Sequence, residues 1–210
     1  MAAHVLDERF SFSFSDHAKQ LYDRVKSFVE QRIKPNEAQW QAELDANRVA
    51  GNPWKPIAIA EQLKQEARAQ GLWNLFLTGE AESSSRTGAG LTCVEYAPIA
   101  ELMGGNAWTA EVFNCSAPDT GNMEVLHRFG SASQKKQWLA PLLAGKIRSA
   151  FCMTEPAVAS SDATNMALSI AKCADGGYEL NGRKWWISGV MDPRCELLIV
   201  MGRKKQYRHW

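Results

Sequence analysis

The chain has 210 residues, of which 45% are hydrophobic and 22% charged, and this composition excludes a disordered, collagen-like or coiled-coil chain. Lysine and arginine total 24 against 23 acidic residues, so the formal net charge of +1 provides no general attraction for a polyanion. We therefore expect no nucleic-acid partner. The length corresponds to between one and two domains.

The apolar runs and the metal-binding residue types indicate neither a membrane span nor a metal site. The longest apolar runs are far shorter than the roughly 18 residues of a membrane helix. The N-terminal stretch MAAHVLDERF contains early acidic residues and no apolar block, which favours a cytoplasmic location, with a mitochondrial or peroxisomal one as the alternative in a eukaryote. The 5 cysteines include no C-x-x-C pair and the 4 histidines are scattered, so we expect reduced thiols and no metal.

Helical spacing of apolar residues dominates the first two thirds of the chain. Ser15 is typical of a helix cap, Pro35 of a helix end or kink, and Gly145 of a helix stop. The expected helices lie at 15–35, 57–71, 91–104, 116–129 and 133–144. Thr78–Gly90 is rich in glycine, serine and charge, and predicts a surface loop long enough for a binding role. We therefore predict an all-helical N-terminal domain over residues 1–145.

From residue 146 onward the apolar spacing becomes typical of strands. Short strands are expected at 147–154, 168–173, 178–181, 183–188 and 196–201. The turns between them include the sequences DGG at 175–177 and NG at 181–182, which favour antiparallel hairpins. The predicted fold class is therefore α+β, with the helical domain followed by a partial antiparallel β-domain over residues 146–210 that is incomplete at its C-terminus.

Two segments of this β-domain carry residues suited to a ligand. Residues 151–165, FCMTEPAVASSDATN, pass from an apolar strand into small and hydroxyl residues, which allow close approach of the backbone and can bind phosphate or carbonyl oxygens. An ordinary polar turn is the alternative. Residues 183–189, RKWWISG, place adjacent tryptophans on an expected strand, so one indole can enter the core while the other meets a flat ligand. The alternative is that both indoles simply pack.

Taken in order, the two segments resemble the acyl-CoA dehydrogenase family. The resemblance is carried by TEP, then small residues with a Ser-Asp pair, then a hairpin, then N-G-x-K-x-W-I-S. Members of this family use FAD to oxidise the bond between carbons two and three of an acyl-CoA thioester. The resemblance implies FAD as cofactor, acyl-CoA as substrate, electron-transfer flavoprotein or a similar acceptor, a role in β-oxidation of fatty acids, and allows a homo-oligomer.

The resemblance also implies which residues contact the cofactor. They are Phe151, Met153, Thr154, Ser160, Trp186, Ile187 and Ser188. Thr154 is expected to donate hydrogen bonds to the pyrimidine side of the flavin, and Trp186 to pack on the isoalloxazine. Ser188 stands where most members have threonine and keeps the hydroxyl near the reactive nitrogen. Ser160 is expected at the boundary between the FAD diphosphate and the acyl-CoA, although the common G-A-G-S wording is A-V-A-S at 157–160.

No catalytic residue is identified in this sequence. Family members are considerably longer, and their second half is a helical domain that carries the catalytic glutamate. Glu155 belongs to the flavin-loop motif and Glu179 to the hairpin, so neither stands in the position of that base. The expected function is an FAD-dependent acyl-CoA dehydrogenase, present as an N-terminal portion that is weak or inactive alone. The alternatives are a non-catalytic protein that binds flavin, acyl-CoA or a partner, and a helical interaction module without a ligand.

Overall fold

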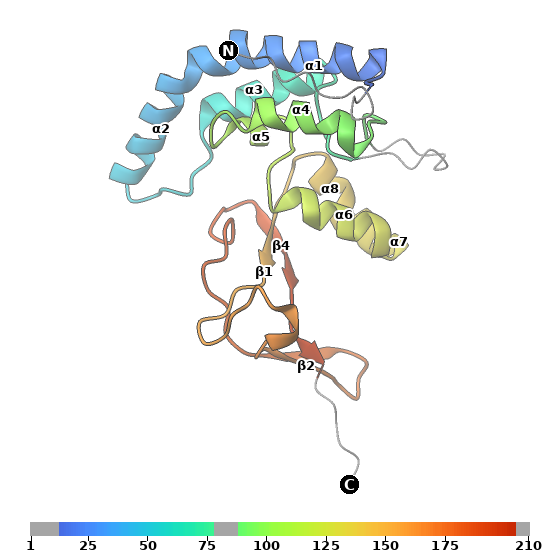
Figure 1. The fold of residues 1–210 in the computed structure, drawn as a ribbon. Coiled ribbons are helices and arrows are strands. Elements are labelled where there is room, and N and C mark those ends of the chain that lie inside the picture. Colours follow the sequence, from blue (N-terminus) through green and yellow to red (C-terminus); the bar gives the residue numbers. More distant parts are fainter. Residues whose placement is uncertain (1–12, 78–87, 205–210) are drawn as a thin grey trace, which may run out of the picture. The chain divides into compact units, whose positions relative to one another are not determined.

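The computed structural model describes residues 13–77 and 88–204 (Figure 1). The chain divides into two compact units, Met1–Ser116 and Ala117–Trp210. In the part of the chain that is described, the first unit is helical, and the second contains helices followed by all of the strands. The expected order of a helical N-terminal part and a small sheet part is therefore confirmed. Most of the predicted loop Thr78–Gly90 lies outside the described residues.

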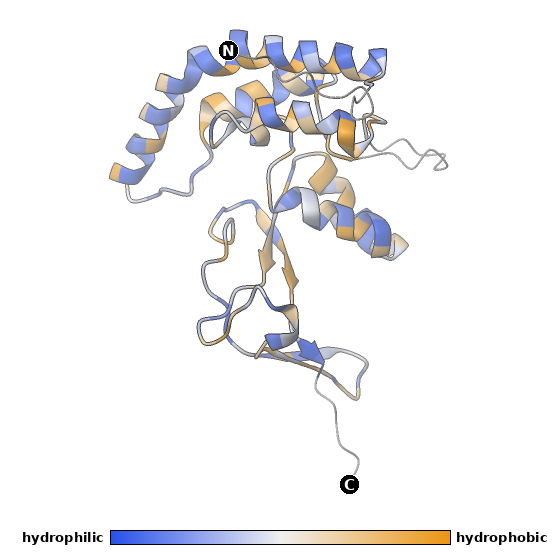
Figure 2. Ribbon diagram, in the orientation of Figure 1, coloured by the Kyte–Doolittle hydropathy of each residue, from blue (hydrophilic) through white to orange (hydrophobic). Residues whose placement is uncertain are grey.

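The first helix begins where the sequence predicts. Helix α1 (Asp16–Phe28) is capped by Ser15, whose hydroxyl accepts a hydrogen bond from the Ala18 amide at 3.2 Å. The buried residues of α1 are the apolar stripe seen in the sequence, and hydrophilic residues cover its outer face (Figure 2). Local spacing and a local cap are thus sufficient to specify this helix.

Pro35 does not end the helical path. The chain continues through a π-helical turn (η2, Val29–Ile33) and a 3-10 turn (η3, Lys34–Asn36) into helix α2 (Glu37–Val49), which leaves α1 at an angle (Figure 1). Proline has no amide hydrogen to donate, so the hydrogen-bond pattern of the helix changes around it. The same pairing of a π-helical turn with a proline recurs at Pro141 in the second unit.

Three further helices complete the core of the first unit. They are α3 (Ala58–Ala69), α4 (Cys93–Met103) and α5 (Thr109–Val112). Phe113 is fully buried after α5, and its ring packs edge to face against Phe28 of α1 with 5.5 Å between centroids. The core of the first unit therefore contains residues from both its first helix and its last.

A buried lysine ties α3 to α5. The side chain of Lys64 is 8% exposed, and its ammonium donates hydrogen bonds to Glu61 at 2.6 Å and to Glu111 at 2.5 Å. A charge removed from water is tolerated only when it is paired and hydrogen-bonded. The two carboxylates provide this pairing, and Glu111 on α5 fixes the contact between the two helices.

The helices of the second unit come before its strands. They are α6 (Asp119–Phe129), α7 (Ala132–Gln134), a π-helical turn (η4, Lys135–Leu139) and α8 (Ala140–Leu143). They occupy the segments expected at 116–129 and 133–144. The compact units divide at residues 116 and 117, whereas the change in apolar spacing falls at 145 and 146, so these helices share a unit with the sheet.

A buried polar network holds α6 against strand β1 (Arg148–Cys152). Asp119 accepts hydrogen bonds from the amide and the hydroxyl of Ser149, at 2.7 Å and 2.6 Å, and forms an ion pair with Arg148. Asn122 donates a hydrogen bond to the Ser149 hydroxyl at 2.9 Å. Asp119 and Ser149 are 3% and 1% exposed, so these polar groups depend on each other for partners. The network therefore fixes the start of the sheet on the helix.

The strand pairing differs from the expected hairpins. Strand β1 pairs in parallel with β4 (Cys195–Val200). Strand β2 (Ser169–Lys172) pairs antiparallel with β3 (Tyr178–Asn181) and in parallel with β5 (Arg203–Lys204). Among the described strands only β2 and β3 form a hairpin, because β4 belongs to a separate two-stranded sheet, in which it runs parallel to β1. The expected strand at 183–188 is wrong, since this segment has irregular structure.

Substitution of the buried aromatic core is expected to destabilise the protein. Phe113→Ala removes a fully buried ring and should lower the free energy of unfolding by about 3 to 5 kcal/mol, measured by urea denaturation followed by circular dichroism. Phe129→Ala is the matched control, because Phe129 is 81% exposed and its removal should change the free energy by less than about 0.5 kcal/mol. Equal losses in the two variants would contradict this assignment of the core.

Candidate functional site

A buried carboxylate lies at the centre of the two motifs singled out in the sequence. The side chain of Glu155, in the loop that follows β1, is 2% exposed. It accepts hydrogen bonds from the Ala167 amide at 2.6 Å, the Leu168 amide at 2.9 Å and the Lys184 ammonium at 2.8 Å. The hydrogen bond from Lys184 is the main reason that the pKa of Glu155 is lowered to about 2. Three segments that are distant in sequence therefore meet at one charged group.

Lys184 makes further contacts that bring the two motifs side by side. Its side chain is 10% exposed, and its ammonium also donates to the Met153 carbonyl at 2.8 Å and lies 3.5 Å from the Met166 sulfur. An ammonium has three hydrogens to donate, and each has a partner here. The Trp185 amide donates to the Thr154 carbonyl at 3.1 Å. The second motif thus lies along the first.

The Ser160 hydroxyl closes the loop of the first motif. It accepts a hydrogen bond from the Glu155 amide at 2.6 Å and donates to the Val158 carbonyl at 3.3 Å. Ser160 is 8% exposed. Further along, Asp162 accepts hydrogen bonds from the amide and hydroxyl of Thr164, which lower the pKa of the Asp162 carboxyl. The side chains of Ser160 and Asp162 therefore stabilise the conformation of the loop.

The other predicted site residues lie on or near the surface of this unit. Thr154, Trp186 and Ser188 are exposed, with Trp186 at 81%, and three are partly buried: Phe151, Met153 and Ile187. Among the described residues, neither the hydroxyl of Thr154 nor that of Ser188 has a hydrogen-bond partner. The structure thus brings the two motifs together and leaves an indole and two hydroxyls accessible.

The tryptophan pair does not follow the alternation of a strand. Trp186 has a φ of 52°, in the left-handed region, and the rings of Trp185 and Trp186 lie 5.9 Å apart between centroids with 57° between their planes. Trp185 is 45% exposed, so the expectation that one indole enters the core is wrong. The expectation fails because the backbone here is irregular. Neighbouring side chains point to opposite faces only in a strand.

Sequence reasoning missed the importance of Glu155 and Lys184 as a pair. Both residues lie within the quoted motifs, but the sequence separation of 29 follows no local spacing rule. One signal was available, since Lys184 is a charged residue next to two tryptophans in a segment expected to be half-buried. A lysine in such a position requires a partner for its charge.

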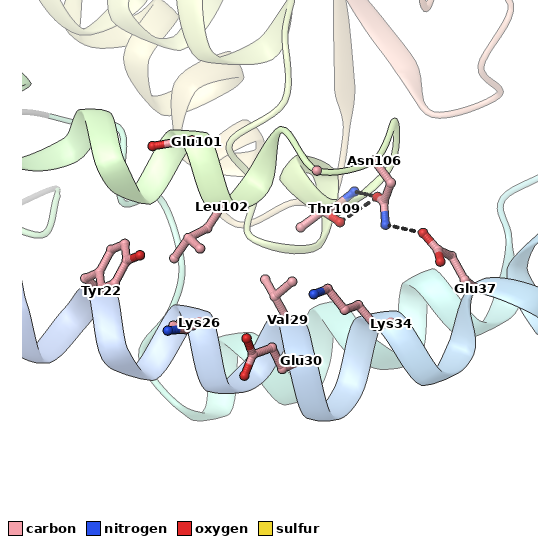
Figure 3. A pocket seen from close by; sticks show the side chains of 11 residues that line it. Tyr22, Lys26, Val29, Glu30, Lys34, Glu37, Glu101, Leu102, Asn106 and Thr109 are labelled. Atoms are coloured by element: carbon pink, nitrogen blue, oxygen red, sulfur yellow. Dashed lines mark hydrogen bonds between the residues drawn. The ribbon is translucent and has the colours of Figure 1, made fainter. Parts of the chain in front are cut away.

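The first unit contains a separate groove of about 540 Å³ between the path from α1 to the start of α2 and the end of α4 with the start of α5 (Figure 3). Charged residues of both signs line it, among them Lys26, Glu30, Lys34, Glu37 and Glu101. None of the site residues expected from the sequence lines this groove. The mixture of charges indicates no particular ligand.

Within residues 13–77 and 88–204, no group of three or more histidine, cysteine, aspartate or glutamate side chains is arranged to hold a metal ion. In the same described ranges, no helix has the length and apolar character needed to cross a membrane.

The fold is that of a two-part α+β protein. Its helical part precedes a small sheet part, and the two motif segments adjoin each other on the sheet part. The model of the acyl-CoA dehydrogenase N-terminal domain matches residues 15–146, and that of the acyl-CoA dehydrogenase middle domain matches residues 150–210. The chain therefore belongs to the acyl-CoA dehydrogenase family. The resemblance found in the sequence is confirmed.

Individual relatives agree with this assignment. Acyl-CoA dehydrogenase family member 10 of Mus musculus is 51% identical over 189 residues, which are 90% of this chain and 17% of that protein. The solved structure of a Mycobacterium abscessus protein assigned as an acyl-CoA dehydrogenase has a TM-score of 0.84 and 47% identity, over 94% of this chain and 48% of that one. An acyl-CoA dehydrogenase from Bacillus anthracis complexed with FAD has a TM-score of 0.61 and 25% identity, over 91% of this chain and 30% of that one. The chain thus spans less than half the length of these relatives.

The buried carboxylate predicts a specific dependence of stability on pH. The pKa of Glu155 is lowered from 4.5 to about 2, so the charged form stabilises the fold above pH 4.5, and this contribution is lost as the pH falls towards 2. Glu155→Gln removes the titrating group. The variant should be less stable at neutral pH, and its urea midpoint should fall less steeply than that of the wild type below pH 4.5. Glu179→Gln, on the exposed strand β3, is the control and should keep the wild-type slope.

Proposed function

We propose that this chain is the flavin-binding part of an acyl-CoA dehydrogenase. The observation that carries the proposal is the hydrogen-bonded contact between the two motifs, in which Trp185 and Lys184 bond to the backbone of Thr154 and Met153. This contact places the exposed Trp186 on a segment that adjoins the exposed Thr154. A relative of the same fold is complexed with FAD, which supports the choice of cofactor.

The residues present suit a large aromatic cofactor with polar edges. The indole of Trp186 offers a flat apolar surface, and the Thr154 and Ser188 hydroxyls offer hydrogen bonds to ring carbonyls and nitrogens. Phe151, Met153 and Ile187 lie partly buried within the same two motifs and would supply the apolar edge. When bound, the flavin supplies the capacity to accept a hydride, and the protein supplies placement and hydrogen bonds.

We further propose that the substrate is an acyl-CoA thioester, that the backbone at Ser160 contributes to its binding, and that an electron-transfer flavoprotein or a similar protein accepts the electrons. The family assignment supports these proposals. The setting would be β-oxidation of fatty acids.

A second candidate, a flavin- or acyl-CoA-binding chain without catalysis of its own, is favoured by the state of Glu155. A general base must accept a proton at working pH and reach the substrate. Glu155 is buried, fully hydrogen-bonded and has a pKa lowered to about 2, so it does neither. Asp162 is held in its turn by Thr164. The described carboxylates of the two motifs therefore hold the loop in its conformation through hydrogen bonds. A catalytic base would have to come from outside these two motifs.

The proposed cofactor is tested by incubating the purified chain with FAD and removing the excess. The protein should retain visible flavin absorption. Trp186→Ala should weaken the binding by about 2 kcal/mol, roughly 30-fold, because the exposed indole is buried on contact with the ring. Trp54→Ala is the control, since Trp54 is 48% exposed in the first unit and should leave the affinity unchanged. A colourless protein that remains folded would contradict the proposal.

Catalysis is tested by mixing the FAD-loaded chain with acyl-CoA substrates and an artificial electron acceptor. We expect turnover well below about 1 per second, because positioned acid-base groups contribute a factor of about 100 to 10,000 and none is available in the two motifs. Turnover at or above that rate would show that the chain contains a base. Loss of such turnover in Glu179→Gln, with FAD still bound, would assign the role to Glu179.

A further inference from the structure

The backbone of the first motif is held by hydrogen bonds at three consecutive residues. The Met153 carbonyl accepts from Lys184, the Thr154 carbonyl accepts from the Trp185 amide, and the Glu155 amide donates to Ser160. In a trans peptide the carbonyl and the following amide hydrogen point in opposite directions. The bond from Lys184 to the Met153 carbonyl therefore turns the Thr154 amide hydrogen away from the buried lysine.

The second motif is held at the same place. Trp186 has a left-handed backbone, which is unfavourable for a residue with a Cβ and persists only where the surroundings fix it. The two residues before it make those fixing contacts, through the Lys184 ammonium and the Trp185 amide. The conformation that exposes the indole thus depends on the contact with the first motif.

The approach of the second motif also depends on Gly182. A Cβ built at this glycine would lie 2.6 Å from the Leu168 Cα and 2.7 Å from its Cβ, closer than real contacts allow. Leu168 is the residue whose amide donates to Glu155. The chain from β3 therefore passes directly over the segment bonded to Glu155 just before it supplies Lys184.

The strands do not need this ion pair for their own hydrogen bonds. Neither Glu155 nor Lys184 belongs to the paired residues of β1 with β4 or of β2 with β3. The pair instead joins the irregular segments that carry Thr154 and Trp186. The pair therefore acts most directly on the arrangement of the exposed residues, in addition to its contribution to the stability of the fold.

We propose that the ion pair between Glu155 and Lys184 is a positioning device that holds the Thr154 and Trp186 segments in register for the flavin. Lys184 touches no cofactor in this proposal and acts through its neighbours. The expected effect of this ion pair on affinity rests on the proposed FAD binding. The coupling of the two segments does not, because it is a property of the chain without cofactor.

The test compares Lys184→Met with Lys172→Met in the 210-residue chain. Lys172 is an exposed lysine at the end of β2 and serves as the matched control. Without FAD, hydrogen exchange in Lys184→Met should become faster at the Trp185 amide by a larger factor than at the amides of the β2–β3 hairpin. With FAD, the dissociation constant should rise about tenfold or more, because a small displacement of contacting groups costs a large part of their interaction. Lys172→Met should match the wild type in both measurements.

Lys184→Arg retains the charge and should recover most of the affinity that Lys184→Met loses. If Lys184→Met does not fold, Lys184→Gln provides the same comparison with a neutral donor. A dissociation constant within twofold of wild type, unchanged exchange at Trp185, or a uniform loss of protection over the whole sheet would overturn the proposal. If the wild type itself retains no FAD, the proposed function fails, and the exchange of the cofactor-free chain still decides whether Lys184 couples the two segments.

Discussion

The buried ion pair of Glu155 with Lys184 is the constraint on which the arrangement of the candidate site depends. Removing either charge from water costs several kcal/mol unless the geometry supplies partners for every donor and acceptor. Here both carboxylate oxygens and all three ammonium hydrogens have them, and the partners include backbone groups of residues 153, 167 and 168. Because these backbone groups come from separate segments, satisfying the pair also determines where those segments lie.

This constraint divides the motif residues into those that fix the conformation of the loop and those whose side chains are accessible. The residues that fix the loop are hydrogen-bonded and little exposed: Glu155 and Ser160 are buried, and the Lys184 side chain is 10% exposed. The accessible ones lie close to them in sequence: Thr154 precedes Glu155, and Trp186 is two residues after Lys184. The division explains why a glutamate in a conspicuous motif is unsuited to proton transfer. A carboxylate that fixes the fold through its charge loses that function when it accepts a proton.

Much of the fold could be predicted because its signals are local. Ser15 caps its helix, Gly145 follows the last helical segment with a positive φ, and strand β3 has the predicted bounds Tyr178–Asn181. The errors arise where distant contacts override local pattern. The apolar residues around Trp186 have the composition of a strand, but the ion pair and the left-handed turn direct the chain away from the sheet. The family motifs identified the candidate residues, whereas their physical connection required the three-dimensional structure.

The irregular backbone has a consequence for recognition that a strand would not give. On a strand, the two indoles would stand on opposite faces and at most one would meet a given ligand. The left-handed conformation at Trp186 instead brings both rings within 5.9 Å between centroids, and both are substantially exposed. Aromatic rings at this separation interact favourably with each other and extend the apolar surface beyond a single indole. The energetic cost of the backbone conformation is therefore linked to a larger exposed aromatic surface on the segment that is hydrogen-bonded to Thr154, and this surface suits the proposed flavin.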